Sequence, residues 1–253
     1  MKILGIDSSS LVASVAIVED DILVAEYTTN FKKTHSQTLL PMIDEITKMT
    51  ETDLSTIDAI AVTGGPGSFT GLRIGSATAK GLGFALNKPI INIKTINAMA
   101  YNLYDSNHYI CPMMDARRNQ VYTGIFTFQD KTMQTILPQC AIALEELLDT
   151  LIALEQKEKK GIALLGDGVP VYQEKINEYL KDKLGYLPDY VPAHLNRQKA
   201  GSVAALAARF LKTGNEADSC HLEKAEEHKP DYLRLSQAER EKKEREKRKH
   251  EMS

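Results

Sequence analysis

Asp7 follows a short apolar stretch, KILGI, and is itself followed by three serines. A carboxylate at the end of a strand, beside a hydroxyl-rich turn, can hold a hydrated magnesium ion or order the turn through its own hydrogen bonds. Asp7, Ser8 and Ser9 are therefore candidates for nucleotide or phosphate binding. An Asx-turn with a purely structural role explains the same residues equally well.

Two other segments carry groups that suit phosphate. Gly166 and Gly168 follow an apolar stretch and could form a second phosphate-binding turn. Arg117 and Arg118 follow Asp115, and their guanidinium groups could hold a phosphate or carboxylate in bidentate fashion. An internal ion pair between Asp115 and an arginine is an equal alternative.

The sequence predicts no metal site and no catalytic residue. A metal site on one helix needs a second ligand three or four residues from His35, and Leu39 cannot supply it. The cysteines, Cys111, Cys140 and Cys220, are widely spaced and odd in number, which indicates free thiols in the cytoplasm rather than disulfides. We expect no tightly bound cofactor.

The segment GGPGSFTGLRIG, residues 64–75, suggests a nucleotide loop but fits neither common template. It lacks the Lys-Ser/Thr of a P-loop, and Thr70 occupies the third glycine position of GxGxxG. Small residues instead recur every fourth position, at Gly67, Gly71, Gly75, Ala79 and Gly83. This spacing predicts one face of a helix from about Ser68 to Leu86, with Ser68 as its N-cap.

Each glycine inside that helix costs about 1 kcal/mol relative to alanine, so close packing must offset the loss. The small-residue face could pack inside its own domain or against another subunit, and spacing alone favours the first. Arg73 and Lys80 argue against a membrane span, and no other stretch reaches the necessary length.

The 253 residues, 43% of them hydrophobic, suffice for one large or two ordinary domains. With 31 basic and 34 acidic residues, the chain has no overall polycationic character, so nucleic acid would have to meet a local patch or a partner. Residues 236–253 form a highly charged tail. A solvated face is favoured there over a nucleic-acid contact.

Hydrophobic periodicity predicts an α/β protein of two lobes. Strands are expected at 2–6, 14–19, 22–29, 57–65, 88–94, 109–116, 120–128 and 161–168, and helices at 35–50, 68–86, 98–104, 142–158, 171–180 and 198–212. The lobes comprise residues 1–104 and 105–235, and helix 198–212 is expected to return to the first lobe. Pro41 predicts a kink or a late start in helix 35–50.

Five motifs in order closely resemble the TsaB (YeaZ) family over residues 1–235. They are MKILGIDSSS, THSQTLLPMI, GGPGSFTGLRIG, PMMDARRNQVY and KPDYLR. The resemblance implies an ASKHA (actin/Hsp70-like) fold of two ribonuclease-H-like lobes. It also implies an accessory role in making threonylcarbamoyladenosine at position 37 of tRNAs that read ANN codons.

In that system the resemblance assigns catalysis to the sister subunit TsaD, which binds metal through paired histidines, and it adds the ATPase TsaE. TsaB pairs with TsaD through its first lobe and also self-associates, so the small-residue helix becomes the expected interface. The expected interface residues are Ser68, Gly71, Leu72, Gly75, Ser76, Ala79 and Gly83. ATP or ADP with magnesium is expected only at the complex interface, and tRNA mainly through the complex.

Ser9 departs from the Asp-x-Gly-Thr turn of sugar kinases, actin and Hsp70 chaperones, where glycine lets the backbone close on phosphate. This departure and the missing second histidine favour a non-catalytic scaffold. The alternative is an ASKHA-type ATPase or small-molecule kinase that uses Asp7 beside magnesium.

Overall fold

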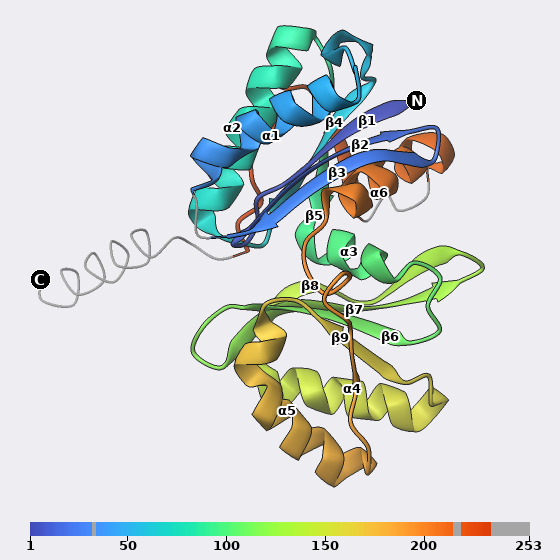
Figure 1. Ribbon diagram of the computed structural model, residues 1–253. Coiled ribbons are helices and arrows are strands. Elements are labelled where there is room, and N and C mark those ends of the chain that lie inside the picture. Colours follow the sequence, from blue (N-terminus) through green and yellow to red (C-terminus); the bar gives the residue numbers. More distant parts are fainter. Residues whose placement is uncertain (32–33, 215–218, 234–253) are drawn as a thin grey trace, which may run out of the picture.

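The computed structural model describes residues 1–31, 34–214 and 219–233, and its chain forms two stacked lobes, each built around one sheet (Figure 1). The predicted tail, 236–253, lies outside the described residues. The α/β fold of two ribonuclease-H-like lobes is confirmed.

The first lobe contains a six-stranded sheet in the order β11-β5-β4-β1-β2-β3. Tight turns join β1 to β2 and β2 to β3 in an antiparallel meander, while β4 and β5 run parallel to β1. The strands are β1 (Lys2–Asp7), β2 (Val12–Glu19), β3 (Ile22–Asn30), β4 (Ala59–Gly65), β5 (Ile90–Lys94) and β11 (Cys220–Glu223).

The second lobe repeats this topology with the strand order β10-β9-β6-β7-β8. Strands β6 to β8 again form an antiparallel meander, and β9 and β10 again add in parallel. The strands are β6 (Tyr109–Asp115), β7 (Gln120–Gln129), β8 (Thr132–Ala143), β9 (Ile162–Leu165) and β10 (Asp189–Tyr190).

Two helices cover one face of each sheet. Helices α1 (His35–Met49) and α2 (Phe69–Leu86) pack on the first sheet, and α4 (Leu144–Glu158) and α5 (Gly168–Leu184) pack on the second. Short 3-10 turns, η1 (Leu54–Thr56) and η2 (Tyr101–Leu103), complete the helical segments.

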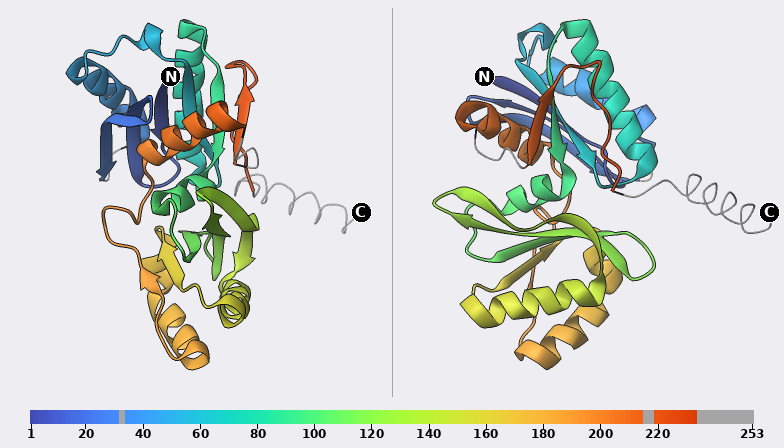
Figure 2. Two further views of the ribbon diagram at one scale, coloured as in Figure 1. Left: turned by 90° about the vertical axis from the view of Figure 1, so that its right-hand side faces the viewer. Right: turned by 180° about the vertical axis from the view of Figure 1, so that it is seen from behind.

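The remaining helices are exchanged between the lobes (Figure 2). Helix α6 (Ala200–Thr213) follows the second lobe but packs its Val203, Leu206 and Ala207 on the other face of the first sheet. Helix α3 (Thr95–Ala100) follows the first lobe but packs on the second sheet. The exchange ties the two lobes together, and α6 lies on the first lobe as the sequence predicted for residues 198–212.

Several details differ from the expectations, including the unpredicted strands β8, β10 and β11. Residues 220–223 pair with β5, so the chain after α6 belongs to the first lobe and not, as predicted, to the second. Helix α1 starts at His35 and continues through Pro41. Its buried apolar stripe is Leu39, Ile43 and Ile46, whereas Leu40 and Met49 of the same helix are exposed.

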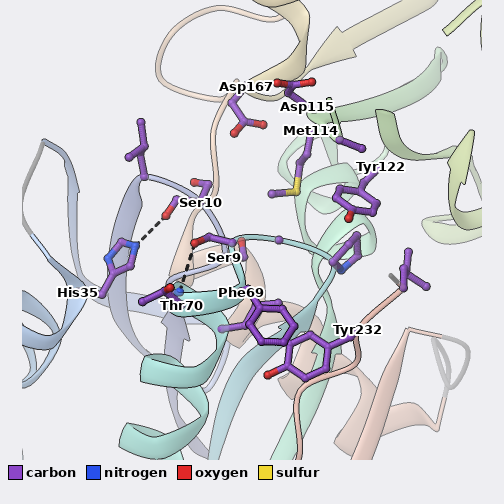
Figure 3. Close-up of a pocket in the computed structure, with 18 of the residues that line it drawn as sticks. Ser9, Ser10, His35, Phe69, Thr70, Met114, Asp115, Tyr122, Asp167 and Tyr232 are labelled. Carbon is purple, nitrogen blue, oxygen red and sulfur yellow. Dashed lines mark hydrogen bonds between the residues drawn. The ribbon is translucent and has the colours of Figure 1, made fainter. Parts of the chain in front are cut away.

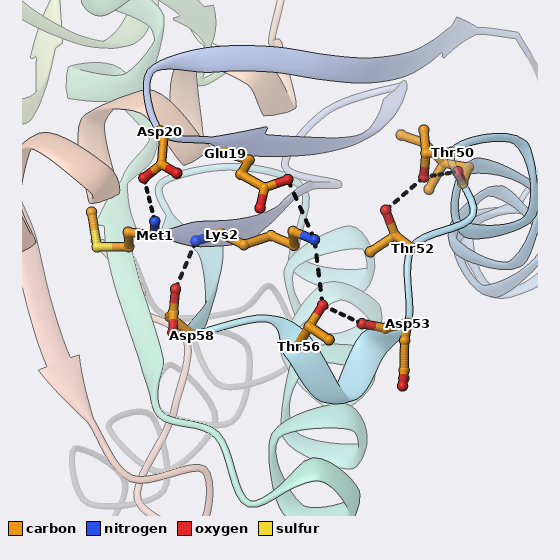
Figure 4. Close-up of polar contacts among 10 residues, drawn as sticks. Met1, Lys2, Glu19, Asp20, Thr50, Thr52, Asp53, Thr56 and Asp58 are labelled. Atoms are coloured by element: carbon orange, nitrogen blue, oxygen red, sulfur yellow. Dashed lines mark hydrogen bonds and ion pairs between the residues drawn. The ribbon is translucent and has the colours of Figure 1, made fainter.

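Polar contacts fix the outer end of the first sheet, away from the lobe interface (Figure 4). The backbone N–H of Lys2 donates to the Asp58 carboxylate at 2.7 Å, and the Lys2 ammonium lies 3.3 Å from Glu19. The amino group of Met1 pairs with Asp20. These contacts set the start of β1, and Asp7 lies at its other end.

Candidate functional site: the cleft between the lobes

A cleft of about 620 Å³ separates the two lobes (Figure 3). Its walls come from the turn after β1, the N-termini of α1 and α2, the end of β6, and residues 231–233. These elements include most of the motifs that the sequence analysis selected. The cleft is therefore the candidate functional site.

The turn after β1 is held by hydrogen bonds between Ser9 and the Asp7 carboxylate. One carboxylate oxygen, Oδ1, accepts hydrogen bonds from the Ser9 backbone N–H at 2.8 Å and from the Ser9 hydroxyl at 2.7 Å. Asp7 is 1% exposed and is not among the residues that line the cleft. Burial raises the pKa of Asp7 to about 6, against the opposing effect of the Ser9 hydrogen bonds. Of the two alternatives for Asp7, the structure has the Asx-turn.

The glycines of α2 and its preceding loop make room for this turn. A Cβ on Gly67 would lie closer than 3.0 Å to the Ser9 carbonyl oxygen, and one on Gly71 would collide with the Ser8 carbonyl oxygen. A Cβ on Gly75 would collide with the Ser8 hydroxyl. That hydroxyl donates to the Gly71 carbonyl at 2.9 Å. The glycine row thus serves close packing inside the lobe rather than phosphate binding.

This packing bears on the expected interface, which stays a prediction. Six of its seven residues are buried within the chain itself: Gly71, Leu72, Gly75, Ser76, Ala79 and Gly83. The Asp7 turn covers Gly71 and Gly75, and Ala225 covers Gly83. Only Ser68 is exposed, and its hydroxyl caps α2 by accepting from the Gly71 N–H at 3.3 Å. The predicted N-cap is confirmed.

His35 points from the start of α1 toward the same turn (Figure 3). Its Nε2 lies 2.7 Å from the Ser10 carbonyl oxygen, so Nε2–H donates there. Leu39, four residues on, is buried in the core of the first lobe. No group of three His, Cys, Asp or Glu side chains could hold a metal ion among the described residues.

Arg117 and Arg118 lie in an exposed loop between β6 and β7, with φ of 62° and 56°. Asp115 accepts from the Arg117 backbone N–H and from the Tyr172 hydroxyl, both at 2.8 Å. Within the described residues neither guanidinium forms an ion pair with Asp115, so the proposed internal pair is absent there. Arg117 lines the cleft, whereas Arg118 does not.

Gly166 and Gly168 pack against β6 and do not line the cleft. A Cβ on Gly166 would collide with the Met113 carbonyl oxygen, and Gly166 has φ of 109°. Between them, Asp167 does line the cleft, and its partial burial raises its pKa against the opposing charge of Arg197. The geometry of the two glycines is that of a tight packing turn.

The C-terminal segment was not expected at the cleft. Tyr232 stacks on Phe69 with ring centroids 4.2 Å apart, and the Arg73 guanidinium lies 4.2 Å from the Phe69 centroid. The Asp231 N–H donates to the Gly64 carbonyl at 2.7 Å. The KPDYLR motif was the available signal, but nothing in its composition indicates that it returns to α2.

Comparisons with known proteins agree with this architecture. The profile of the family described as "TsaD: tRNA N6-adenosine threonylcarbamoyltransferase" matches residues 23–242. The "tRNA threonylcarbamoyladenosine biosynthesis protein TsaB" of Bacillus subtilis strain 168 is 31% identical over 240 residues, covering 94% of this chain and 96% of that protein. A "tRNA N6-adenosine threonylcarbamoyltransferase" of Brachyspira hyodysenteriae is 36% identical over 123 residues, covering 42% of this chain and 36% of that protein.

Among solved structures, "YeaZ from Pseudomonas aeruginosa" superposes with a TM-score of 0.69 at 24% identity, covering 91% of this chain and 99% of that one. None of the helices in the described part is long and apolar enough to cross a membrane. The extent and identity of the match to the Bacillus relative settle the family: the chain belongs to the TsaB (YeaZ) family, whose curated members are named for tRNA threonylcarbamoyladenosine biosynthesis.

Proposed function

We propose that this chain is a non-catalytic accessory subunit of tRNA threonylcarbamoyladenosine biosynthesis that works in the cytoplasm. It binds TsaD, and with it TsaE, while TsaD transfers the threonylcarbamoyl group to adenosine 37. The closed Asp7 turn is the observation that carries the proposal. A carboxylate that is 1% exposed and already bonded to Ser9 cannot ligate magnesium beside a phosphate unless the turn opens.

The exposed sides of α1 and α2 are the proposed partner surface. These neighbouring helices carry three large apolar side chains in water: Leu40 is 55% exposed, Met49 67% and Phe84 73%. Contiguous exposed apolar patches mark interaction sites, so the proposal requires these side chains to belong to one contact surface. A homodimer and a heterodimer with TsaD would compete for this surface.

The surface is tested by introducing a charge at its most exposed apolar residue. We expect Phe84→Glu to abolish co-elution with TsaD and to shift a homodimer toward monomer, because an unpaired carboxylate would be buried in the contact. Val171→Glu is the matched control, since Val171 is 58% exposed on α5 of the other lobe. Equal complex formation by the Phe84→Glu variant and the parent would show that α2 is not part of the interface.

The accessory role is tested by threonine incorporation into unmodified tRNA. The reaction contains the adenylate-forming enzyme, TsaD, TsaE and ATP, with and without this chain. We expect incorporation to require the chain, and the chain alone to turn over neither ATP nor the adenylate. ATP hydrolysis by the chain alone, lost in the Asp7→Ala variant, would replace the proposal with an ASKHA-type ATPase or kinase.

In this proposal, nucleotide, magnesium and tRNA bind to the complex of the chain with its partners. We expect ATP or ADP with magnesium to bind where the chain meets its partner, because the chain's own turn is closed. Titration of ATP into the chain alone and into the complex separates the two cases.

A further inference from the structure

We infer that residues 224–233 form a displaceable strap over α2, and that a partner segment carrying carboxylates takes the place of this strap. The inference rests on the proposed function, because it concerns the α2 side of the proposed partner surface. The strap leads from the end of β11 along α2 and reaches the cleft with its last three residues (Figure 2).

The strap follows α2 from its last turn back to its first residue. At one end, the Cβ of Ala225 lies 2.9 Å from the position of a Cβ on Gly83. In the middle, the Lys80 ammonium donates to two carbonyl oxygens of the strap, at 3.0 and 3.1 Å. At the other end, Tyr232 stacks on Phe69, the first residue of the helix. The strap therefore borders α2 along most of its length.

Few groups anchor the strap. It forms no helix or strand, and of its side chains those of Ala225 and His228 alone are buried. Two buried polar atoms at its anchors have no hydrogen-bond partner among the described residues: Nε2 of His228 and Oδ1 of Asn92, whose amide nitrogen donates to Asp231 at 3.4 Å. An unpaired buried polar atom opposes burial, and segments with few buried contacts open at low free energy. The strap is thus suited to local release.

Two cations of α2 are held by neutral oxygen atoms of the strap. Lys80 donates to main-chain carbonyl oxygens, and Nε of Arg73 donates to the Tyr232 hydroxyl at 3.2 Å. Within the described residues neither cation forms an ion pair with a carboxylate. Hydrogen bonds from a cation to a carboxylate are stronger than those to a neutral oxygen. A partner segment with carboxylates would therefore bind these two side chains better than the strap does.

The strap also lies beside the most exposed apolar residue of the proposed partner surface. Phe84 is one helical turn after Lys80, so the two side chains lie on the same face of α2. Release of the strap would uncover Gly83 and the Phe69 ring and would free both cations. Aromatic residues and arginine are enriched in protein interfaces. The uncovered face would extend the exposed side of α2 with the groups that a partner needs.

The first test compares hydrogen exchange of the full-length chain alone and in complex with TsaD. The amides of Glu227 and Asp231 are hydrogen-bonded in the strap. We expect both to exchange faster in the complex, because the partner displaces the strap, while the amides of β11 keep their protection. Equal or slower exchange in the complex would overturn the inference. Absence of a complex would instead refute the accessory role, and with it the partner that the inference requires.

Ala225 offers a matched pair of variants, because its side chain is buried between the strap and α2. Ala225→Asp should release the strap, since its carboxylate would otherwise be buried without a partner. We expect this variant to bind TsaD roughly tenfold more tightly than the parent, because a binding-competent state populated at about 10% lowers the apparent affinity by that factor. Ala225→Ser is nearly the same size and should bind like the parent. Equal affinity of Ala225→Asp and the parent, despite faster exchange of the strap, would overturn the inference.

The charge of the partner segment is tested with the strap already released. In the Ala225→Asp background, Arg73→Gln should weaken TsaD binding by about tenfold, because a hydrogen bond between charged groups is lost. Lys181→Gln is the matched control, since it removes an exposed cation from α5 of the other lobe. Equal affinity of these two variants would overturn the assignment of a carboxylate-bearing segment to this face.

Discussion

Gly71 and Gly81 lie in the same helix but should respond to alanine in opposite ways. A Cβ on Gly81 meets nothing within 4 Å, because the residue is exposed. A Cβ on Gly71 would collide with the Ser8 backbone carbonyl oxygen. The pair therefore separates the intrinsic helix cost of glycine from its role in seating the Asp7 turn.

The expected magnitudes have different origins. Gly81→Ala should raise the free energy of unfolding by about 0.5–1 kcal/mol, which is the helix-interior difference between the two residues. Gly71→Ala should lower it by about 1–3 kcal/mol, because the turn cannot retreat without strain. The Ser8 hydroxyl is bonded to Gly71, and the Ser9 carbonyl accepts from the Ser68 N–H at 2.6 Å.

Urea unfolding of both variants beside the parent measures this difference, which should amount to about 1.5–4 kcal/mol between them. Thermal unfolding gives an independent reading, at roughly 2–4 °C per kcal/mol for a chain of this size. If Gly71→Ala were as stable as Gly81→Ala, the turn would have room to move, and the closed-turn argument for a non-catalytic role would lose its support. By the same geometry, Gly75→Leu should damage the fold, because a Cβ at Gly75 would collide with the Ser8 hydroxyl.

Three further predictions concern the Asp7 turn and the walls of the cleft. Burial raises the pKa of Asp7 from 3.8 to about 6, so the native state binds the proton more tightly and the free energy of unfolding falls as pH rises through that range. Asp7→Asn should therefore be more stable than the parent above pH 6, by up to roughly 3 kcal/mol. Urea titrations at each pH should show this difference closing toward pH 4. Ser68→Ala should cost about 1 kcal/mol in unfolding free energy, with Ser68→Asp restoring it as an alternative cap. Tyr232→Ala should lose the stack on Phe69, worth about 0.5–1.5 kcal/mol, and speed hydrogen exchange in residues 224–233 while α5 is unchanged.

Strongly periodic segments could be predicted from the sequence because local composition determines them. The N-cap Ser68 and the small-residue face of α2 follow from spacing. The buried stripe of α1 follows in the same way, at Leu39, Ile43 and Ile46. What spacing cannot provide is the identity of the surface that a small-residue face meets. The Asp7 turn, sixty residues earlier in the chain, fills that role.

The parts that the sequence analysis missed have weak local signals. β10 has two residues, and β11 has four, of which His221 and Leu222 are exposed. Buried and exposed side chains do not alternate regularly along β8, because this strand forms an edge of its sheet and most of its side chains are partly exposed. The return of residues 224–233 rests on long-range contacts, such as the Lys80 ammonium donating to the carbonyls of Glu226 and His228. No pattern within ten residues encodes such contacts.

The TsaD profile matches most of this chain but not its N-terminal segment. The profile begins at residue 23, so its match includes α2, the second sheet and the exchanged helices but leaves out β1, the Asp7 turn and β2. In that turn, the Ser9 side chain donates to Asp7 and is itself fully buried. A glycine there would have no hydroxyl to make this bond. The Ser9 hydroxyl therefore holds the Asp7 carboxylate in a packed structural turn beside the cleft, which is the arrangement that the proposed accessory role requires.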